Sequence, residues 1–519
     1  MTSRLLRNAL LAATAAASLV APSQAEWRRA TSRHFIVYSQ GSANELKQSV
    51  TALERYEQLL RLMSISKPDE DSAPLTVFMV TDADHVGDLV NQHGAAGFYT
   101  VGPLGPVAVG SRITDYNAYD SDFTSQVVLF HEYAHHYMLQ NYTAAYPGWF
   151  VEGYAELLGA TTFGSDGSAY VGNVAKYRLA DLHSDNPIAI RDLLADDPDA
   201  RKDRGVYAFY SEAWLLTHYL VFNDTRSPQL HRYLALVSNG MKPMDAAGQA
   251  FGDLSKLVGE YNAYRNSPGL PGIHISQKNA PPIGDIKIET LDPAAQALVW
   301  DRLLYMRNLR GDEAANISAD LAKRAAAAPG DMETLDLLWR FQLAANDTTG
   351  ADRTADTLLA LQPKNAQALL GKGLVAMKKL EDAKDYSAPK WAAARQYVID
   401  ANEAQTGSAE ILFAYYQSFV RAQQQPSKAA KLGLLRAFEL EPQSNNFRLT
   451  LAGSLIGERR YSEARIVLKP AAYSVHDTKS AGWAQRMLGT IDKLKDGDPP
   501  PMILPEIDKA NDDAKPKKG

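Results

Sequence analysis

A proline-containing junction recurs at a fixed spacing in the second half of the chain, and this period restricts the fold more than any other feature. Pro329 follows an alanine-rich helical segment, and Pro363 follows a similar segment 34 residues later. A third junction at Pro442 lies 79 residues after Pro363, which is two 34-residue steps plus 11. Such a period indicates stacked units that bury their apolar faces only against their neighbours. We expect helical pairs over residues 293–495, interrupted by a loop or an irregular unit.

These junctions resemble those of tetratricopeptide repeats. The run from Leu359 to Leu369 reads LALQPKNAQAL, and 34 residues is the length of one tetratricopeptide unit. The resemblance implies an all-α array of helix hairpins, in preference to an unrelated helical bundle. Such arrays have concave surfaces that bind peptides or proteins, so we expect the substrate or a protein partner to dock there.

The first half of the chain has a mixed pattern. Strands are predicted at residues 34–39 and 75–80, an amphipathic helix at 44–63, a short helix at 82–91 and a hairpin over 97–109. From about Phe123 onward the pattern is almost entirely helical. We therefore expect an α+β domain over residues 26–266, with a small mixed sheet and several helices. Residues 267–292, which begin rich in proline and glycine, are expected to be a linker. Residues 496–519 are rich in proline, aspartate and lysine and are expected to be a disordered tail.

The N-terminus has the pattern of a secretory signal peptide. Arg4 and Arg7 form a basic region, an apolar region follows from Ala9 to Val20, and small residues end at Ala25. We expect cleavage after residue 25. A membrane anchor is disfavoured, because the apolar stretch is shorter than the ~20 residues that span a bilayer. The mature chain, from Glu26 onward, contains no other candidate membrane span.

The composition narrows the class of protein further. The chain has no cysteine, which excludes disulfides, thiolate metal ligands and lipoprotein acylation. Its net charge of −6 becomes −8 once the two signal arginines are removed, so no nucleic-acid partner is expected. An exported chain without disulfides fits a periplasmic or secreted protein.

One predicted helix carries two histidines that can bind the same metal ion. His131 and His135 are four residues apart, so both imidazoles leave one helical face and can reach one Zn²⁺. Glu132 is offset around the helix and is placed to take a proton from a metal-bound water. A second helix follows, in which Glu152 and Glu156 are also four residues apart. Glu152 completes the three ligands of a catalytic zinc site, and Glu156 is placed to accept the other N–H of a ligand histidine.

The segments His131–His135 (HEYAH) and Trp149–Glu156 (WFVEGYAE) resemble the gluzincin metallopeptidases, and most closely the peptidase-MA-like group, whose members often carry tetratricopeptide repeats. The resemblance implies a zincin-like catalytic fold over residues 26–266 and is specific between about Gln126 and Glu156. It implies that His131, His135 and Glu152 bind one zinc ion per chain and that Glu132 is the general base. The amine-binding segment of the aminopeptidases is not visible, so the resemblance does not extend to aminopeptidase specificity.

Two further elements are expected to serve catalysis. Tyr210 begins a downstream helix and resembles the tyrosine that stabilises the oxyanion in aminopeptidase-like gluzincins, with Tyr207 as the alternative. The hairpin over 97–109 is either an edge that pairs with an extended peptide substrate or a purely structural element. His136 follows the second ligand and is expected to point away from the metal.

Three functions are compatible with these features. The chain is predicted to be a zinc peptidase that cuts exported or envelope proteins or peptides, with the repeats recruiting substrate or partner. The alternative is a repeat scaffold with a vestigial zincin domain, against which the intact set of ligands and Glu132 argues. The third is hydrolysis of a non-protein amide, such as one in cell-wall peptide.

Overall fold

The computed structural model describes residues 26–64, 73–81, 86–87, 89, 96–102, 104–112, 123–142, 144–182, 187–196, 205–276, 281–472 and 477–500. The expected signal peptide and most of the short helix expected at 82–91 lie outside these residues. Within them, no helix is both long enough and apolar enough to cross a membrane.

A six-stranded mixed sheet forms the centre of the first half of the chain, in the order β4-β5-β3-β2-β1-β9. Its strands are β1 (Arg28–Thr31), β2 (Phe35–Ser39), β3 (Leu75–Val80), β4 (Gly97–Gly102), β5 (Gly105–Ser111) and β9 (Lys287–Thr290). Strand β3 runs parallel to β2 and β5, whereas β4 and β5 form an antiparallel hairpin that leaves β4 at the edge. The two strands and the hairpin predicted from the sequence are therefore confirmed.

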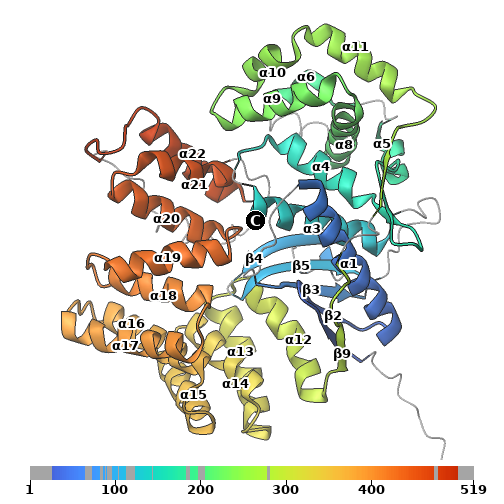
Figure 1. Ribbon diagram of the computed structural model, residues 1–519. Helices are drawn as coiled ribbons and strands as arrows, with labels where there is room; N and C mark the ends of the chain where they lie inside the picture. Colours follow the sequence, from blue (N-terminus) through green and yellow to red (C-terminus); the bar gives the residue numbers. More distant parts are fainter. Residues whose placement is uncertain are drawn as a thin grey trace, which may run out of the picture.

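Both faces of this sheet are apolar, so each face needs a covering layer. Phe35, Val37 and Val77 pack under α1 (Ala43–Ser64) and α3 (Ser125–Asn141). The alternate residues Tyr38 and Phe78 point to the opposite face and stack on each other at 4.9 Å. That second face is covered by α12 (Pro293–Met306), the first helix of the second half (Figure 1).

A helical subdomain follows α3 in the chain. It comprises α4 (Gly148–Gly159), α5 (Leu179–Leu182), α6 (Ile190–Leu194), α8 (Val206–Phe222), α9 (Arg226–Ser238), α10 (Pro243–Phe251) and α11 (Leu254–Arg265), with a short 3₁₀ turn at Lys176–Arg178. Its core contains the fully buried Trp149 and Trp214, on α4 and α8. A small sheet of β6 (Thr162–Phe163), β7 (Ala169–Val171) and β8 (Ile273–Ile275) lies beside it.

The segment expected to be a linker, residues 267–292, contributes two strands to these sheets. Strand β8 pairs with β7, and β9 pairs with β1. The Arg29 Nε donates to Glu289 Oε1 at 2.7 Å across the β1–β9 pair. The chain therefore returns to the first sheet before it enters the repeats.

The second half is all-helical, as predicted. Its helices are α12, α13 (Gly311–Ala327), α14 (Met332–Ala344), α15 (Thr348–Leu361), α16 (Ala366–Asp382), α17 (Ala388–Ala404), α18 (Ala409–Val420), α19 (Lys428–Leu440), α20 (Asn445–Gly457), α21 (Tyr461–Ala472) and α22 (Thr478–Ile491). From α13 onward consecutive helices pack against each other, α12 packs against α14, and the helices form a curved stack in Figure 1. A disordered tail is expected from residue 496, but the first residues of this segment contact the stack. The Gly497 N–H donates to the Arg459 carbonyl at 2.9 Å. Residues 501–519 lie outside the described residues.

The 11 extra residues between two of the repeat junctions do not form an inserted loop. Helices α16 and α17 have 17 residues each, whereas α14 and α15 have 13 and 14. The helix starts are 43 residues apart from α16 to α18 and 36 from α18 to α20, which together give 79. One long hairpin thus absorbs most of the irregularity, because extra turns extend a helix without breaking its packing.

The repeats also contact the β4–β5 hairpin. At Gly102, an added Cβ would lie 2.4 Å from Met306 Cε of α12. At Gly105, in the turn with φ of +97°, it would lie 3.6 Å from Glu441 Oε1, at the end of α19. Helices far apart in the array thus touch the same hairpin.

Candidate metal centre

The helix α3 places His131 and His135 on one face, one turn apart. Thr124 begins the helix by accepting a hydrogen bond from the Val127 N–H at 3.3 Å. The apolar side of the helix, which includes Phe130, is buried against α1 and the sheet. The Nε2 atoms of His131 and His135 lie 3.0 Å apart, with 15% and 2% of their side chains exposed.

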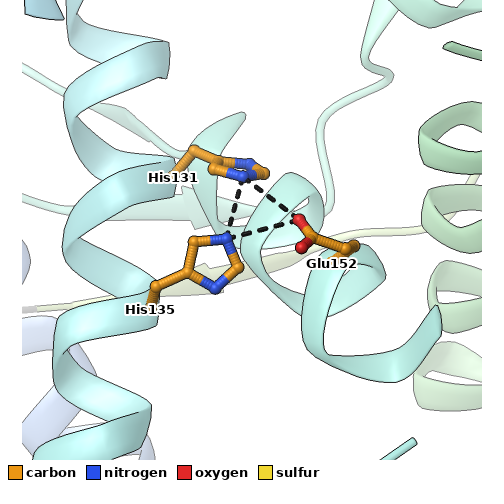
Figure 2. A group of neighbouring side chains, drawn as sticks. All are labelled: His131, His135 and Glu152. Carbon is orange, nitrogen blue, oxygen red and sulfur yellow. Dashed lines mark hydrogen bonds and ion pairs between the residues drawn. The ribbon is translucent and has the colours of Figure 1, made fainter. Parts of the chain in front are cut away.

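The helix α4 brings Glu152 to these histidines. Its Oε2 lies 3.5 Å from His131 Nε2 and 3.3 Å from His135 Nε2. Figure 2 shows the three side chains converging from two helices. The next residue, Gly153, allows α4 to approach α8, since an added Cβ would lie 2.2 Å from the Ala213 carbonyl oxygen. The position of Glu152 therefore depends on a close helix–helix contact.

The spacing of the three donor atoms fits a metal ion. Ligands at 2.0–2.1 Å in tetrahedral geometry around zinc are separated by roughly 3.3 Å. The separations of 3.0, 3.3 and 3.5 Å lie within a few tenths of an ångström of that value. Two imidazole nitrogens and one carboxylate oxygen also form a donor set that suits zinc. The three residues proposed from the sequence are therefore brought together in an arrangement able to hold this ion.

Glu156 lies on the far side of His131. Its Oε1 is 3.4 Å from His131 Nδ1, so it can accept the N–H of the ring nitrogen that faces away from His135. Arg178 donates to both carboxylate oxygens, from Nη2 at 2.5 Å and from Nε at 3.1 Å, and Tyr177 Oη donates at 3.2 Å. Arg178 could not be recognised from the sequence as part of the site, because nothing in the spacing between residues 156 and 178 indicates the contact.

The electrostatic environment attracts a cation. Burial alone would lower the pKa of His131, but the hydrogen bond with Glu152 and the charges of Glu156 and Glu132 raise it to about 9. Burial raises the pKa of Glu156, yet the charges of Arg178 and His131 outweigh it and leave that pKa below its usual value. Glu156 thus stays ionised behind the imidazole of His131.

The structure distinguishes the two candidate tyrosines. Tyr210, in the first turns of α8, has its ring 6.2 Å from the His131 ring, in an edge-to-face arrangement. The charge of Glu152, followed by burial and the charge of Glu132, raises the pKa of Tyr210 well above its usual value, so its hydroxyl stays protonated. Tyr207 is 51% exposed on the surface of the same helix. Of the two, Tyr210 lies beside the candidate ligand His131.

Strand β4 passes beside the helical turn that carries Glu132. A Cβ added at Gly97 would lie 2.4 Å from Val128 Cγ1 and 3.4 Å from Glu132 Cγ. The residues of β4 are all partly exposed, as expected for an edge strand. His136 is buried away from the donor atoms, where its Nδ1 lies 3.1 Å from Tyr99 Oη on β4. Burial lowers its pKa to about 3, which keeps it neutral.

The chain has a similar protein among solved structures, but none among protein families or curated proteins. No model of a known protein family matches the sequence, and no curated protein matches it. Among solved structures, the chain is similar to the crystal structure of a thermophilic TPR protein from Thermus thermophilus. The two are 18% identical, the match covers 38% of this chain and 98% of that chain, and the TM-score is 0.33.

Proposed function

We propose that the protein is a zinc-dependent peptidase of the gluzincin type, with a zincin-like catalytic domain and helical repeats that recruit substrate or a partner. The observation that carries the proposal is the convergence of His131, His135 and Glu152 at tetrahedral spacing. Glu156 behind His131 supports it, since metal-bound histidines usually donate their second N–H to a carboxylate. A vestigial site would have little reason to keep this outer contact.

The residues around the ligands fit the hydrolysis of an amide. A zinc ion held there would polarise the substrate carbonyl and make a water molecule more acidic. Glu132 neighbours His131 without being one of the three donors, and we assign it the role of taking the proton of that water and passing it to the leaving amine. Tyr210 keeps its proton and would donate a hydrogen bond to the developing oxyanion. The edge strand β4 would bind an extended peptide through main-chain hydrogen bonds.

The first test is metal content combined with cleavage. The mature chain, from Glu26 onward, should retain about one zinc per chain and cleave members of a peptide library. Glu132→Gln should abolish cleavage and keep the zinc, whereas His131→Ala and Glu152→Ala should lose the metal. Glu463→Gln, on the exposed side of α21, serves as the matched control and should behave like the parent.

Two results would redirect the interpretation. A chain that binds no metal after zinc reconstitution would refute the peptidase and leave a scaffold that acts through its repeats. A metal-loaded chain that cleaves no peptide, but releases amines from cell-wall fragments in a Glu132-dependent manner, would instead show hydrolysis of a non-protein amide.

We also propose that the protein is exported and processed between Ala25 and Glu26. The support is the sequence pattern of residues 1–25, with basic, apolar and small residues in the order of a signal peptide. N-terminal sequencing of the chain purified from a bacterial periplasm should begin at Glu26. An N-terminus at Met1 would contradict export by this route.

A further inference from the structure

Arg178 connects three groups of the candidate site. Its guanidinium donates to both oxygens of Glu156, at 2.5 and 3.1 Å, and is 5.1 Å from the ring centre of Tyr210. The same guanidinium is 5.2 Å from the ring centre of Tyr177. Because Glu156 in turn faces His131 Nδ1 at 3.4 Å, Arg178 links an imidazole of the donor set to the phenol on α8.

Arginine is suited to this position in a way that lysine is not. A planar guanidinium can bind a carboxylate with two parallel hydrogen bonds while its face lies against an aromatic ring. Arg178 makes both kinds of contact, and only 12% of its side chain is exposed. A buried charge with this many partners holds them in one geometry.

The charges around the site give Arg178 a second role. Glu132, Glu152 and Glu156 contribute three negative charges, and Arg178 contributes one positive charge. A divalent cation among the donors would make this group of charges neutral. Without Arg178 the buried group would have one uncompensated carboxylate. Glu156 would also lose two of the three hydrogen bonds that it accepts from Arg178 and Tyr177.

We infer that Arg178 is a positioning residue that fixes Glu156 behind His131 and holds Tyr210 over the site. The inference rests on the proposed metal-dependent function. Without Arg178, Glu156 would keep only the hydrogen bond from Tyr177 and would no longer be fixed behind His131. The His131 ring would then be held less firmly among the three donor residues, and Tyr210 would lose the guanidinium that lies beside its ring.

The test compares Arg178→Met and Arg178→Lys with the parent, using Co²⁺ in place of zinc. The visible absorption of bound Co²⁺ reports the number and geometry of its ligands and does not depend on cleavage. Arg178→Met should change this spectrum and lower kcat by about 10- to 100-fold with little change in KM. Arg178→Lys keeps the positive charge but lacks the paired N–H donors of the guanidinium. Its Co²⁺ spectrum and its kcat should therefore lie between those of the parent and those of Arg178→Met.

Arg340→Met provides the matched control. Arg340 is also a buried arginine bound to carboxylates, Asp336 and Glu410, but it lies in the repeats. Its loss should weaken the fold and leave the Co²⁺ spectrum and kcat unchanged. This comparison separates a general effect of removing a buried cation from a specific effect on the site.

The outcomes distinguish this inference from the proposed function. A parent-like spectrum and kcat in both Arg178 variants would overturn it, even if the protein is an active peptidase. A changed spectrum in a chain that cleaves no peptide would support the role of Arg178 while the peptidase proposal fails. A parent that binds no Co²⁺ would overturn both. If Arg178→Met does not fold, the Arg178→Lys spectrum decides.

Discussion

Gly153→Ala tests the contact on which the site geometry depends. The added Cβ would lie 2.2 Å from the Ala213 carbonyl oxygen and 2.3 Å from Thr217 Oγ1, both on α8. Carbon–oxygen contacts are normally no shorter than about 3.3 Å, so α4 and α8 must separate by roughly 1 Å. Overpacking of this kind costs about 1–3 kcal/mol. The higher helix propensity of alanine offsets up to about 1 kcal/mol of this destabilisation.

The control isolates the packing contribution. Gly259 lies in the exposed part of α11, and an added Cβ there would meet nothing within 4 Å. Gly259→Ala should therefore only increase helix propensity, and should stabilise the chain by up to about 1 kcal/mol. The two variants should differ by about 1–3 kcal/mol in the free energy of unfolding, which corresponds to roughly 2–12 °C in melting temperature.

The same substitution should also lower catalysis, because α8 carries Tyr210. A misplacement of about 1 Å can reduce turnover by about 100-fold. Melting curves followed by circular dichroism, together with kcat on a cleaved peptide, would measure both effects for Gly153→Ala and Gly259→Ala. If Gly153→Ala melted at the temperature of Gly259→Ala and kept the parent kcat, the close packing of α4 on α8 would be refuted.

Three other changes have definite expected outcomes. Tyr210→Phe should lower kcat/KM by about 100- to 1000-fold without loss of zinc, whereas Tyr207→Phe, at a position 51% exposed, should change neither activity nor metal content. Burial, followed by the charge of Glu410, raises the pKa of Glu441 to about 7. The folded chain thus holds a proton that the unfolded chain releases near pH ~4.3, so stability falls as pH rises to about 7 and is flat above. Glu441→Gln should remove this slope in melting temperatures measured from pH 5 to 8. Trp391→Ala, at a fully buried position in α17, should cost about 3–5 kcal/mol in chemical unfolding.

The proximity of the candidate metal ligands could be predicted because their geometry is local. Two residues four apart on a helix share a face whatever the rest of the fold, so the proximity of His131 and His135 follows from one turn of α3. The same reasoning placed Glu152 and Glu156 on one face of α4. Only the meeting of the two helices had to be assumed, and the structure brings them together.

Contacts between distant segments could not be predicted in this way. Arg178 is 22 residues from Glu156 and follows two short strands, so no period relates the two. Strand β9 has four residues, and its partner β1 lies about 260 residues earlier. So short a strand has no detectable alternation of apolar and polar residues. It is a strand only because it pairs with the edge of the sheet.

The position of the boundary between the two halves is explained by the two faces of α12. Val299, Leu303 and Met306 recur at helical spacing and pack on the second face of the sheet, whereas Leu298 packs into the first repeats. The first helix of the array thus covers one face of the sheet. Strand β9 pairs with β1 at the edge of that sheet just before α12 begins. Repeats attached through a shared helix cannot swing freely, because any rotation of α12 would expose apolar strand residues such as Phe78. The array also meets the β4–β5 hairpin through Met306 and Glu441. The array is therefore packed against the turn of the hairpin whose strand β4 passes beside Glu132 at its other end.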